Sequence, residues 1–357
     1  MSVINWLKTK PTPRFFWSNR AAYGVANESN IPLDGSLGLL RFDSQRPTDE
    51  LWEPFGQSRF VVPQEFKLET IDAVIPSPAW NNRLNYNTQD NRMSPDPLWS
   101  QTITRALNLI QQNQLQKVVF ARKEVLKHPH PIHPLILFEK LRQIIPQAHH
   151  FYFEPKPGLA FLGASPEQLY RRVGQQIESE AQAGTRIRGQ TPSEDKILEQ
   201  ELSENPKDHH EHQLVVEYIS HALSTICLEY GVSNPKQVVK LPNVQHLKTR
   251  LSGILKNTIT DQAILAALHP TSAVCGYPIS NAFEFIRGSE SFDRGFYTGA
   301  FGFITEKKSE FNVAIRCAVI SGCDLHLFAG AGIVEGSTAT DEWQEIENKM
   351  AFWRELI

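Results

Sequence analysis

The stretch from residue 330 to residue 349, GAGIVEGSTATDEWQEIENK, carries more information than any other part of the chain. Its Gly-Ala-Gly start predicts a tight turn whose backbone N–H groups face an anion. A helix follows, on which Glu342, Glu345 and Lys349 are spaced i, i+3 and i+7 and therefore project from one face. Carboxylates and an ammonium beside a glycine turn favour a site for a metal ion and an acidic ligand, although a solvated helix with ion pairs also fits the charged stripe alone.

Composition and charge narrow the class of protein. The chain has 357 residues, enough for one large domain or two ordinary ones with a sizeable core. Its 36 basic and 39 acidic residues give a net charge of −3, which provides no net field to attract nucleic acid or an anionic membrane. The four cysteines form no CxxC pair, residues 1–13 lack the apolar core of a signal peptide, and no apolar run approaches about 18 residues. We therefore expect a cytoplasmic protein without nucleic-acid or membrane partners.

Strands occur in blocks and do not alternate regularly with helices. Short apolar runs bounded by turn residues predict strands at 15–17, 37–42, 58–63, 117–122, 151–153, 159–163, 167–172, 176–180, 244–247, 299–305, 311–319 and 325–329. Helical spacing of apolar residues predicts helices at 98–113, 134–145, from 194 onward, and at 208–227, 261–268, 281–286 and 341–356. The Pro-, Asn- and Asp-rich segment 75–97 predicts a surface connection. This order favours the α+β class, with large antiparallel sheets flanked by helices.

Lys117 and Glu167 are candidate proton carriers. Lys117 opens an apolar strand, where a lysine is usually solvated; a lysine drawn into a desolvated cleft can instead serve as a general base. Glu167 ends the segment GASPE at 163–167, where it is either an ordinary turn carboxylate or a proton donor whose pKa is raised by burial.

The segment 207–212, KDHHEH, invites a zinc interpretation that its spacing does not support. The pattern H-x-x-E-H needs histidine at position 208, where the chain has aspartate, and H-E-x-x-H needs it at position 214, where the chain has leucine. Glu211 and Glu345 suit Mg²⁺ better, because this ion prefers oxygen ligands. The dinucleotide pattern G-x-G-x-x-G fails at Glu335, so the glycine turn favours a carboxylate ligand, with Arg316 on the neighbouring strand as its forked partner.

A series of segments between residues 98 and 353 resembles the chorismate-utilising enzymes, and among them the isochorismate synthases most. The segments are KVV at 117–119, GASPE at 163–167, AGTR at 183–186, KDHHEH at 207–212, LHPT at 268–271, RGFYTG at 294–299, IRCA at 315–318, AGAGI at 329–333 and EWQEIENK at 342–349. Each segment alone is weak, but their shared order is specific. Residues 1–95 match the family more loosely.

The resemblance implies a fold, a cofactor and a reaction. The expected architecture is a single two-lobed α+β domain over residues 1–357, with the active site between the lobes in the core 98–353. Lys117 would activate water for attack at C2 of chorismate, and Glu167 would protonate the C4 hydroxyl as it leaves. Glu211 and Glu345 would hold Mg²⁺ against the ring carboxylate.

The resemblance also implies the residues that contact the substrate. Arg316, Lys349 and the backbone around Gly330 and Gly332 would receive the pyruvyl-side carboxylate. Further expected lining residues are Gly184, Thr185, His246, Ala273 and Tyr297. Because chorismate is a dianion, such a site needs concentrated positive charge even in a net acidic protein.

A few positions bear on which family member the chain resembles. Aminodeoxychorismate synthases carry a lysine nucleophile where this chain has Ala183, and anthranilate synthases lack the base that Lys117 supplies, so water is the expected nucleophile. Gln182 stands where an apolar residue is usual, and Ser272 stands where proline is usual. The alternatives are a salicylate synthase, which goes on to eliminate pyruvate, and a non-catalytic homologue that only binds chorismate. Menaquinone, phylloquinone and siderophore pathways all stay open, and we expect a monomer.

Overall fold

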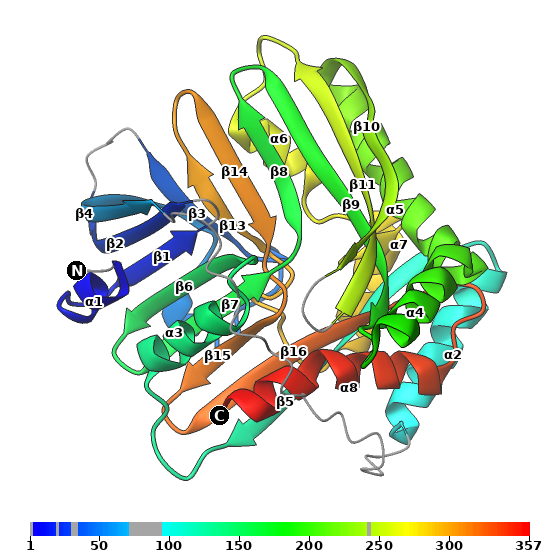
Figure 1. The fold of residues 1–357 in the computed structure, drawn as a ribbon, viewed down its shortest axis with the longest axis horizontal. Helices are drawn as coiled ribbons and strands as arrows, with labels where there is room; N and C mark the ends of the chain where they lie inside the picture. The colour runs from blue at the N-terminus through cyan, green and yellow to red at the C-terminus, as the bar shows by residue number, and fades with distance from the viewer. Residues whose placement is uncertain (1–2, 19–20, 30–34, 71–94, 241–243) are drawn as a thin grey trace.

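The fold consists of two antiparallel sheets that share one strand (Figure 1). The computed structural model describes residues 3–18, 21–29, 35–70, 95–240 and 244–357. In this part of the chain, β4 (Arg59–Thr70) pairs with β2 (Ala21–Ser29) in the first sheet and with β3 (Ser36–Leu40) in the second. The α+β class predicted from the sequence is confirmed.

Both sheets interleave distant parts of the chain. The first sheet runs in the order β4, β2, β1 (Arg14–Ser18), β6 (His149–Lys156), β7 (Leu159–Ser165), β15 (Cys317–Ser321), β16 (Asp324–Ile333), β5 (Lys117–Lys127) and β12 (Gly276–Tyr277). The second runs β4, β3, β13 (Ala300–Ile304), β14 (Lys308–Val313), β8 (Gln168–Val173), β9 (Gln176–Ile187), β11 (Val244–Leu255) and β10 (Cys227–Lys240). Each sheet therefore needs segments from both halves of the chain before it is complete.

Helices cover the outer faces of the sheets. The first sheet packs against α1 (Val3–Lys8), α2 (Pro97–Gln111), α3 (Pro134–Ile144), α7 (Ile279–Ser289) and α8 (Ala339–Leu356), and the second against α4 (Pro192–Glu204), α5 (Pro206–Ile226) and α6 (Asp261–Leu268). A short 3₁₀ turn spans Glu53–Phe55. Figure 1 shows α8 lying along β16 and β5. No helix of the described residues is long and apolar enough to cross a membrane.

Alternation along the strands builds the layers. In β1, Phe15 and Trp17 belong to the apolar layer between the sheets, whereas Phe16 belongs to the layer under the helices. β7 does the same with Phe161 and Leu162. Side chains of a strand point alternately to its two faces, so strands covered on both sides are apolar at nearly every position.

Several elements were not predicted from the sequence: α1, β2, β10, the two-residue β12 and the 3₁₀ turn. β10 is an edge strand, exposed along most of its length, and contains Gly231 and Pro235, which are typical of turns. Its register against β11 is irregular in several places. A polar, bulged edge strand shows no clean alternation of apolar residues, so the sequence pattern did not predict β10.

Two predicted features near the site are wrong. The strand expected at 311–319 is broken: β14 ends at Val313, β15 begins at Cys317, and Arg316 between them has a positive φ of 52°. The glycine turn expected at 330–332 is absent, because both glycines lie inside β16, where they pair with Ala121 and Val119 of β5. The predicted surface connection at 75–97 lies mostly outside the described residues.

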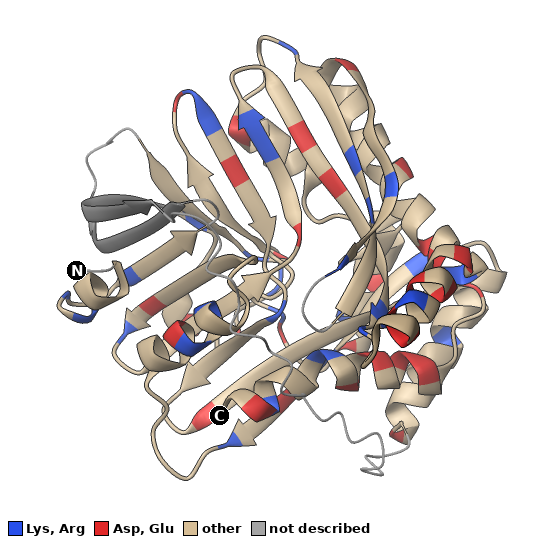
Figure 2. Ribbon diagram, in the orientation of Figure 1, with Lys and Arg blue, Asp and Glu red and all other residues tan. Residues whose placement is uncertain are grey.

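Acidic side chains outnumber basic ones on three of the helices. Figure 2 shows more Asp and Glu than Lys and Arg along α4, α5 and α8. These helices therefore present no concentrated positive charge to an anion. The concentration of charge that a small dianionic ligand needs must therefore be sought inside the molecule.

Candidate active site

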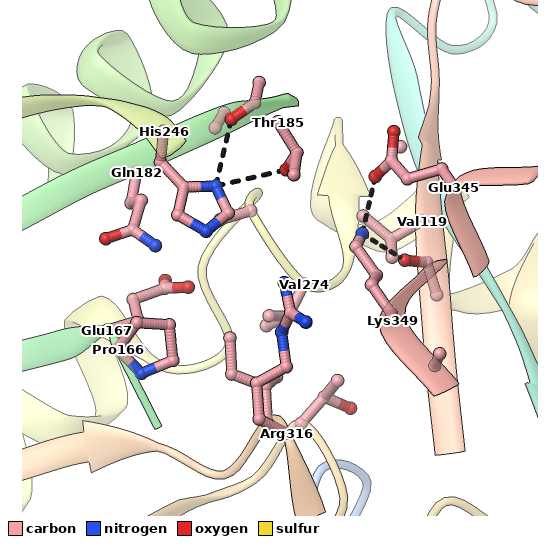
Figure 3. A pocket seen from close by; sticks show the side chains of 18 of the residues that line it. Val119, Pro166, Glu167, Gln182, Thr185, His246, Val274, Arg316, Glu345 and Lys349 are labelled. Carbon is pink, nitrogen blue, oxygen red and sulfur yellow. Dashed lines mark hydrogen bonds and ion pairs between the residues drawn. The ribbon is translucent and has the colours of Figure 1, made fainter. Parts of the chain in front are cut away.

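A pocket lined by strands of both sheets and by α8 contains the predicted site (Figure 3). About 760 Å³ of atom-free space belongs to it, including solvent at its open mouth. Of the residues expected to form the site, all except Lys117 line it: Glu167, Gly184, Thr185, Glu211, His246, Ala273, Tyr297, Arg316, Gly330, Gly332, Glu345 and Lys349. Lys117 lies directly behind this wall, in contact with Glu211.

Glu167 and Arg316 enter the pocket at the places where the chain passes between the sheets. Glu167 stands between β7 of the first sheet and β8 of the second, and Arg316 stands between β14 of the second sheet and β15 of the first. The backbone N–H of Val313 donates to the carbonyl of Glu167 at 3.1 Å, which ties the two crossings together. The left-handed backbone at Arg316 makes the chain turn there, and Figure 3 shows its guanidinium directed into the pocket.

Glu167 is a buried carboxyl group. Only 4% of the residue is exposed, and burial raises the pKa of Glu167 to about 8, although the positive charges of Lys117 and Lys248 counteract part of this rise. Burial disfavours the charged form of a carboxyl group. Glu167 therefore carries its proton at neutral pH and is a competent proton donor.

Lys117 is fully buried and forms an ion pair with Glu211. Its Nζ lies 3.0 Å from Oε1 of Glu211, which reaches over from α5. Gly332 makes this approach possible: a Cβ atom at that position would lie 2.2 Å from the same oxygen and 3.0 Å from Cε of Lys117. The glycine is required for space and does not form a turn.

On the side opposite Glu167, α8 carries Glu345, which lines the pocket, and Glu342, which is buried outside it, and each glutamate pairs with a lysine. Lys349 contacts Oε1 of Glu345 at 2.5 Å and donates to the carbonyl of Gly330 at 2.7 Å. Burial alone would raise the pKa of Glu345, but the Lys349 ammonium holds it below the usual range. One turn earlier on α8, Glu342 forms an ion pair with Lys207 of α5. Burial, and then the charge of Glu345, raise the pKa of Glu342 to about 7.

His246 presents a hydrogen-bond acceptor to the pocket. Burial, with a smaller contribution from Arg316, lowers the pKa of His246 to about 3, so the ring is neutral. Its Nδ1 lies 3.1 Å from the carbonyl of Gly184 and 3.1 Å from Oγ1 of Thr185. Because a carbonyl can only accept, Nδ1 carries the hydrogen. The buried Nε2, without a protein partner in the described residues, is then free to accept a hydrogen bond from a ligand hydroxyl.

Comparisons with known proteins identify the family. Residues 67–356 match the family described as chorismate binding enzyme. The chain belongs to the chorismate-binding enzymes. It is 35% identical over 364 residues to the chloroplastic isochorismate synthase of Catharanthus roseus, with 92% of this chain and 63% of that protein covered. It is 36% identical over 291 residues to the isochorismate synthase MenF of Escherichia coli, with 81% of this chain and 66% of that protein covered.

The structural comparison agrees with the sequence comparison. The menaquinone-specific isochorismate synthase MenF of Escherichia coli superposes with a TM-score of 0.82 at 28% identity, covering 100% of this chain and 91% of that chain. By sequence alignment, this chorismate-binding enzyme spans less than two thirds of the length of both curated relatives. The shared fold places the two sheets and their pocket in the arrangement of an isochorismate synthase.

Sequence reasoning did not assign several lining residues of the pocket in this chorismate-binding enzyme: Val119, Thr298, Ile315 and Phe328. Val119, Thr298 and Ile315 lie within the quoted segments at 117–119, 294–299 and 315–318, which are the signal that could have found them. The ion pair of Lys207 with Glu342, just outside the pocket, was not predicted either.

Proposed function

We propose that this protein is an isochorismate synthase, which converts chorismate into isochorismate. The observation that carries the proposal is a pair of buried groups: the Glu167 carboxyl, which lines the pocket and whose pKa is raised by burial, and the Lys117 ammonium, which lies directly behind the pocket wall. An allylic hydroxyl leaves only when an acid protonates it, and water attacks only when a base removes its proton. An acid that lines the cavity and a base directly behind its wall would meet both requirements once the contact of Lys117 with Glu211 opens.

The proposed proton transfers add up to an isomerisation, with no net gain or loss of atoms by the substrate. Lys117 accepts a proton from the water that attacks C2, and Glu167 donates a proton to the hydroxyl that leaves C4. The ring double bonds shift by one position, and one water molecule enters as another leaves. A lysine accepts a proton only when it is neutral, so the ion pair of Lys117 with Glu211 must open before attack.

Mg²⁺ is the proposed cofactor, and the donor set fits it. Glu211 and Glu345 both line the pocket, and carboxylate oxygens are the ligands that Mg²⁺ prefers. No group of three or more His, Cys, Asp or Glu in the described ranges stands ready to hold a metal ion, but Mg²⁺ usually takes one or two carboxylates and completes its shell with water and substrate. Bound there, Mg²⁺ would neutralise a carboxylate of the substrate.

The remaining charges of the pocket suit the other end of chorismate. Arg316 and Lys349 are the proposed partners of the pyruvyl-side carboxylate, since a guanidinium and an ammonium both bind carboxylates through charge-assisted hydrogen bonds. His246 is proposed to accept a hydrogen bond from a substrate hydroxyl. Tyr297, which stacks on Phe328 with ring centroids 5.3 Å apart, and the small residues Gly184 and Ala273 shape the cavity.

The test is incubation of the purified protein with chorismate and Mg²⁺, followed by chromatographic identification of the products. We expect isochorismate without pyruvate, no product in EDTA, and no turnover by a folded Lys117→Ala variant. Pyruvate formed in step with salicylate would instead indicate a salicylate synthase. Unchanged chorismate would reject the proposed reaction. A single domain, a monomeric state and a cytoplasmic location stay predictions, and size-exclusion chromatography tests the second of them.

A further inference from the structure

Gln182 is a buried polar residue without a protein partner. It lines the pocket with 8% of its surface exposed. Within the described part of the chain, neither atom of its carboxamide hydrogen-bonds to another residue. Because buried polar groups are nearly always hydrogen-bonded, an unpaired carboxamide that faces a cavity points to a ligand.

Strand register explains why the Gln182 side chain faces the pocket without a partner from the described residues. On β9, Ala181 and Ala183 pack into the apolar layer against α5, so Glu180 and Gln182 point to the opposite face. Lys248, which is directly opposite Gln182 on β11, donates to Glu180 at 2.7 Å. Lys248 is thus bound to Glu180 and makes no hydrogen bond with the Gln182 carboxamide.

Gln182 and Glu167 share one side of the pocket. Figure 3 shows them next to each other, with the carboxamide directed toward the space that Glu167 also faces, whereas Lys349 lies on the opposite side. A substrate oxygen that receives a proton from Glu167 therefore lies on the side of the cavity that the Gln182 carboxamide also faces. The neutral ring of His246 is also labelled on this side, but its Nε2, unpaired within the described part of the chain, can only accept a hydrogen bond, so it does not supply the N–H donor that the Gln182 carboxamide offers.

We propose that Gln182 binds the substrate directly, by donating a carboxamide N–H to the C4 oxygen that Glu167 protonates. The inference rests on the proposed function and names a specificity-determining residue for it. As the C4–O bond breaks, its electron pair stays on that oxygen, which takes the proton of Glu167 and leaves as water. A fixed N–H donor at this oxygen stabilises the charge that develops on it, and selects substrates that carry a hydroxyl there.

The test uses Gln182→Leu, which keeps the size of the side chain and removes its hydrogen bond. Two quantities are measured with Mg²⁺ present: kcat/KM for chorismate, and the inhibition constant of the chorismate analogue that lacks the C4 hydroxyl. We expect kcat/KM to fall about 10-fold while the inhibition constant stays within about 2-fold of the wild-type value. Gln168→Leu is the matched control, because Gln168 is similarly buried, neighbours Glu167 in sequence and does not line the pocket.

Two results would overturn the inference: unchanged kcat/KM in Gln182→Leu, or equal losses for chorismate and for the analogue. In both cases the wild-type enzyme still makes isochorismate. If the proposed function itself were wrong, the wild type would make none, so the two failures can be told apart. If Gln182→Leu does not fold, Gln182→Met replaces it, because its unbranched side chain follows the path of glutamine. The same pair of measurements then decides.

Discussion

Two opposite walls of the pocket each carry a glutamate, and the pKa values of these glutamates are shifted in opposite directions. On one wall, Glu167 forms no ion pair with a lysine of the described residues, and burial raises its pKa to about 8. On the other, Glu345 touches Lys349, and its pKa is lowered. A contacting ammonium does not decide the outcome alone, because Glu342 pairs with Lys207 and its pKa is still raised to about 7 by burial and by the charge of Glu345. The balance between burial and all neighbouring charges lets one pocket hold a proton donor beside a cation site.

The largest expected effect comes from removing the acid of the first wall. Glu167→Gln keeps the shape of the side chain but has no proton to give, so we expect kcat for isochorismate formation to fall about 10³-fold. The assay is chromatography of the products at saturating chorismate. A variant with more than about a tenth of wild-type activity would show that Glu167 is not the acid.

The second largest effect is expected on Mg²⁺ affinity, from removing the charge of the two carboxylates proposed to bind the ion. Glu211→Gln and Glu345→Gln each remove one carboxylate from the proposed Mg²⁺ site, and we expect metal affinity to fall at least about 10-fold. Calorimetric titration with Mg²⁺ measures this without relying on turnover. Glu347→Gln on the same helix is the control, because Glu347 forms ion pairs with Arg122 and Arg354 and does not line the pocket. Equal affinities in all three variants would contradict the assignment.

A smaller effect should follow from one added methyl group. Gly332→Ala places a Cβ where Oε1 of Glu211 now lies, so the carboxylate must move away from Lys117. Small displacements of catalytic groups are costly, and we expect an approximately 10-fold loss of kcat/KM with little loss of stability. Gly231→Ala on β10 is the control, because its Cβ would meet nothing within 4 Å. Normal kinetics in Gly332→Ala would show that this contact is unimportant.

The smallest effect concerns stability and sharpens the contrast between the walls. A carboxyl group whose folded pKa is raised binds more protons when folded than when unfolded, so its contribution to stability falls as pH rises from about 4.5 to about 8. Glu167→Gln lacks this penalty, so its free energy of unfolding should exceed that of wild type by about 1 kcal/mol at pH 8. Below pH ~4 the two free energies of unfolding should agree. The gain stays small because a buried carboxamide also loses hydrogen bonds to water. Urea unfolding at several pH values measures it.

Much of the fold and of the candidate site could be predicted from the sequence, because these features depend on local patterns. The helical spacing of Glu345 and Lys349 placed both on one face of α8, and the apolar run after Lys117 predicted β5. The α+β class followed from blocks of strands. Ordered motifs supplied the site residues, whose roles stay proposals.

The parts that could not be predicted depend on contacts between distant segments. Nothing near Lys117 in the sequence indicates that Glu211, from a helix about 90 residues later, buries its ammonium. The break at Arg316 is a tertiary feature, because an apolar run such as 311–319 is equally suited to one strand or two. Gly330 and Gly332 suggested a turn, yet both lie in β16, where the need for glycine comes from tertiary contacts: a Cβ at residue 332 would lie 2.2 Å from Oε1 of Glu211, and one at residue 330 would lie 3.1 Å from the Tyr297 hydroxyl.

The most direct test of the contrast is an infrared titration of the carboxyl groups. At pH 7, the protonated carboxyl band of the wild-type protein should contain a component that is missing in Glu167→Gln, retained in Glu345→Gln, and lost in wild type as pH passes about 8. Glu342, whose pKa is raised to about 7, contributes to the wild-type and Glu167→Gln spectra alike and cancels in their difference. If the wild-type and Glu167→Gln spectra agree at pH 7, Glu167 is already ionised. The two walls would then be alike, and the proposed acid would be lost.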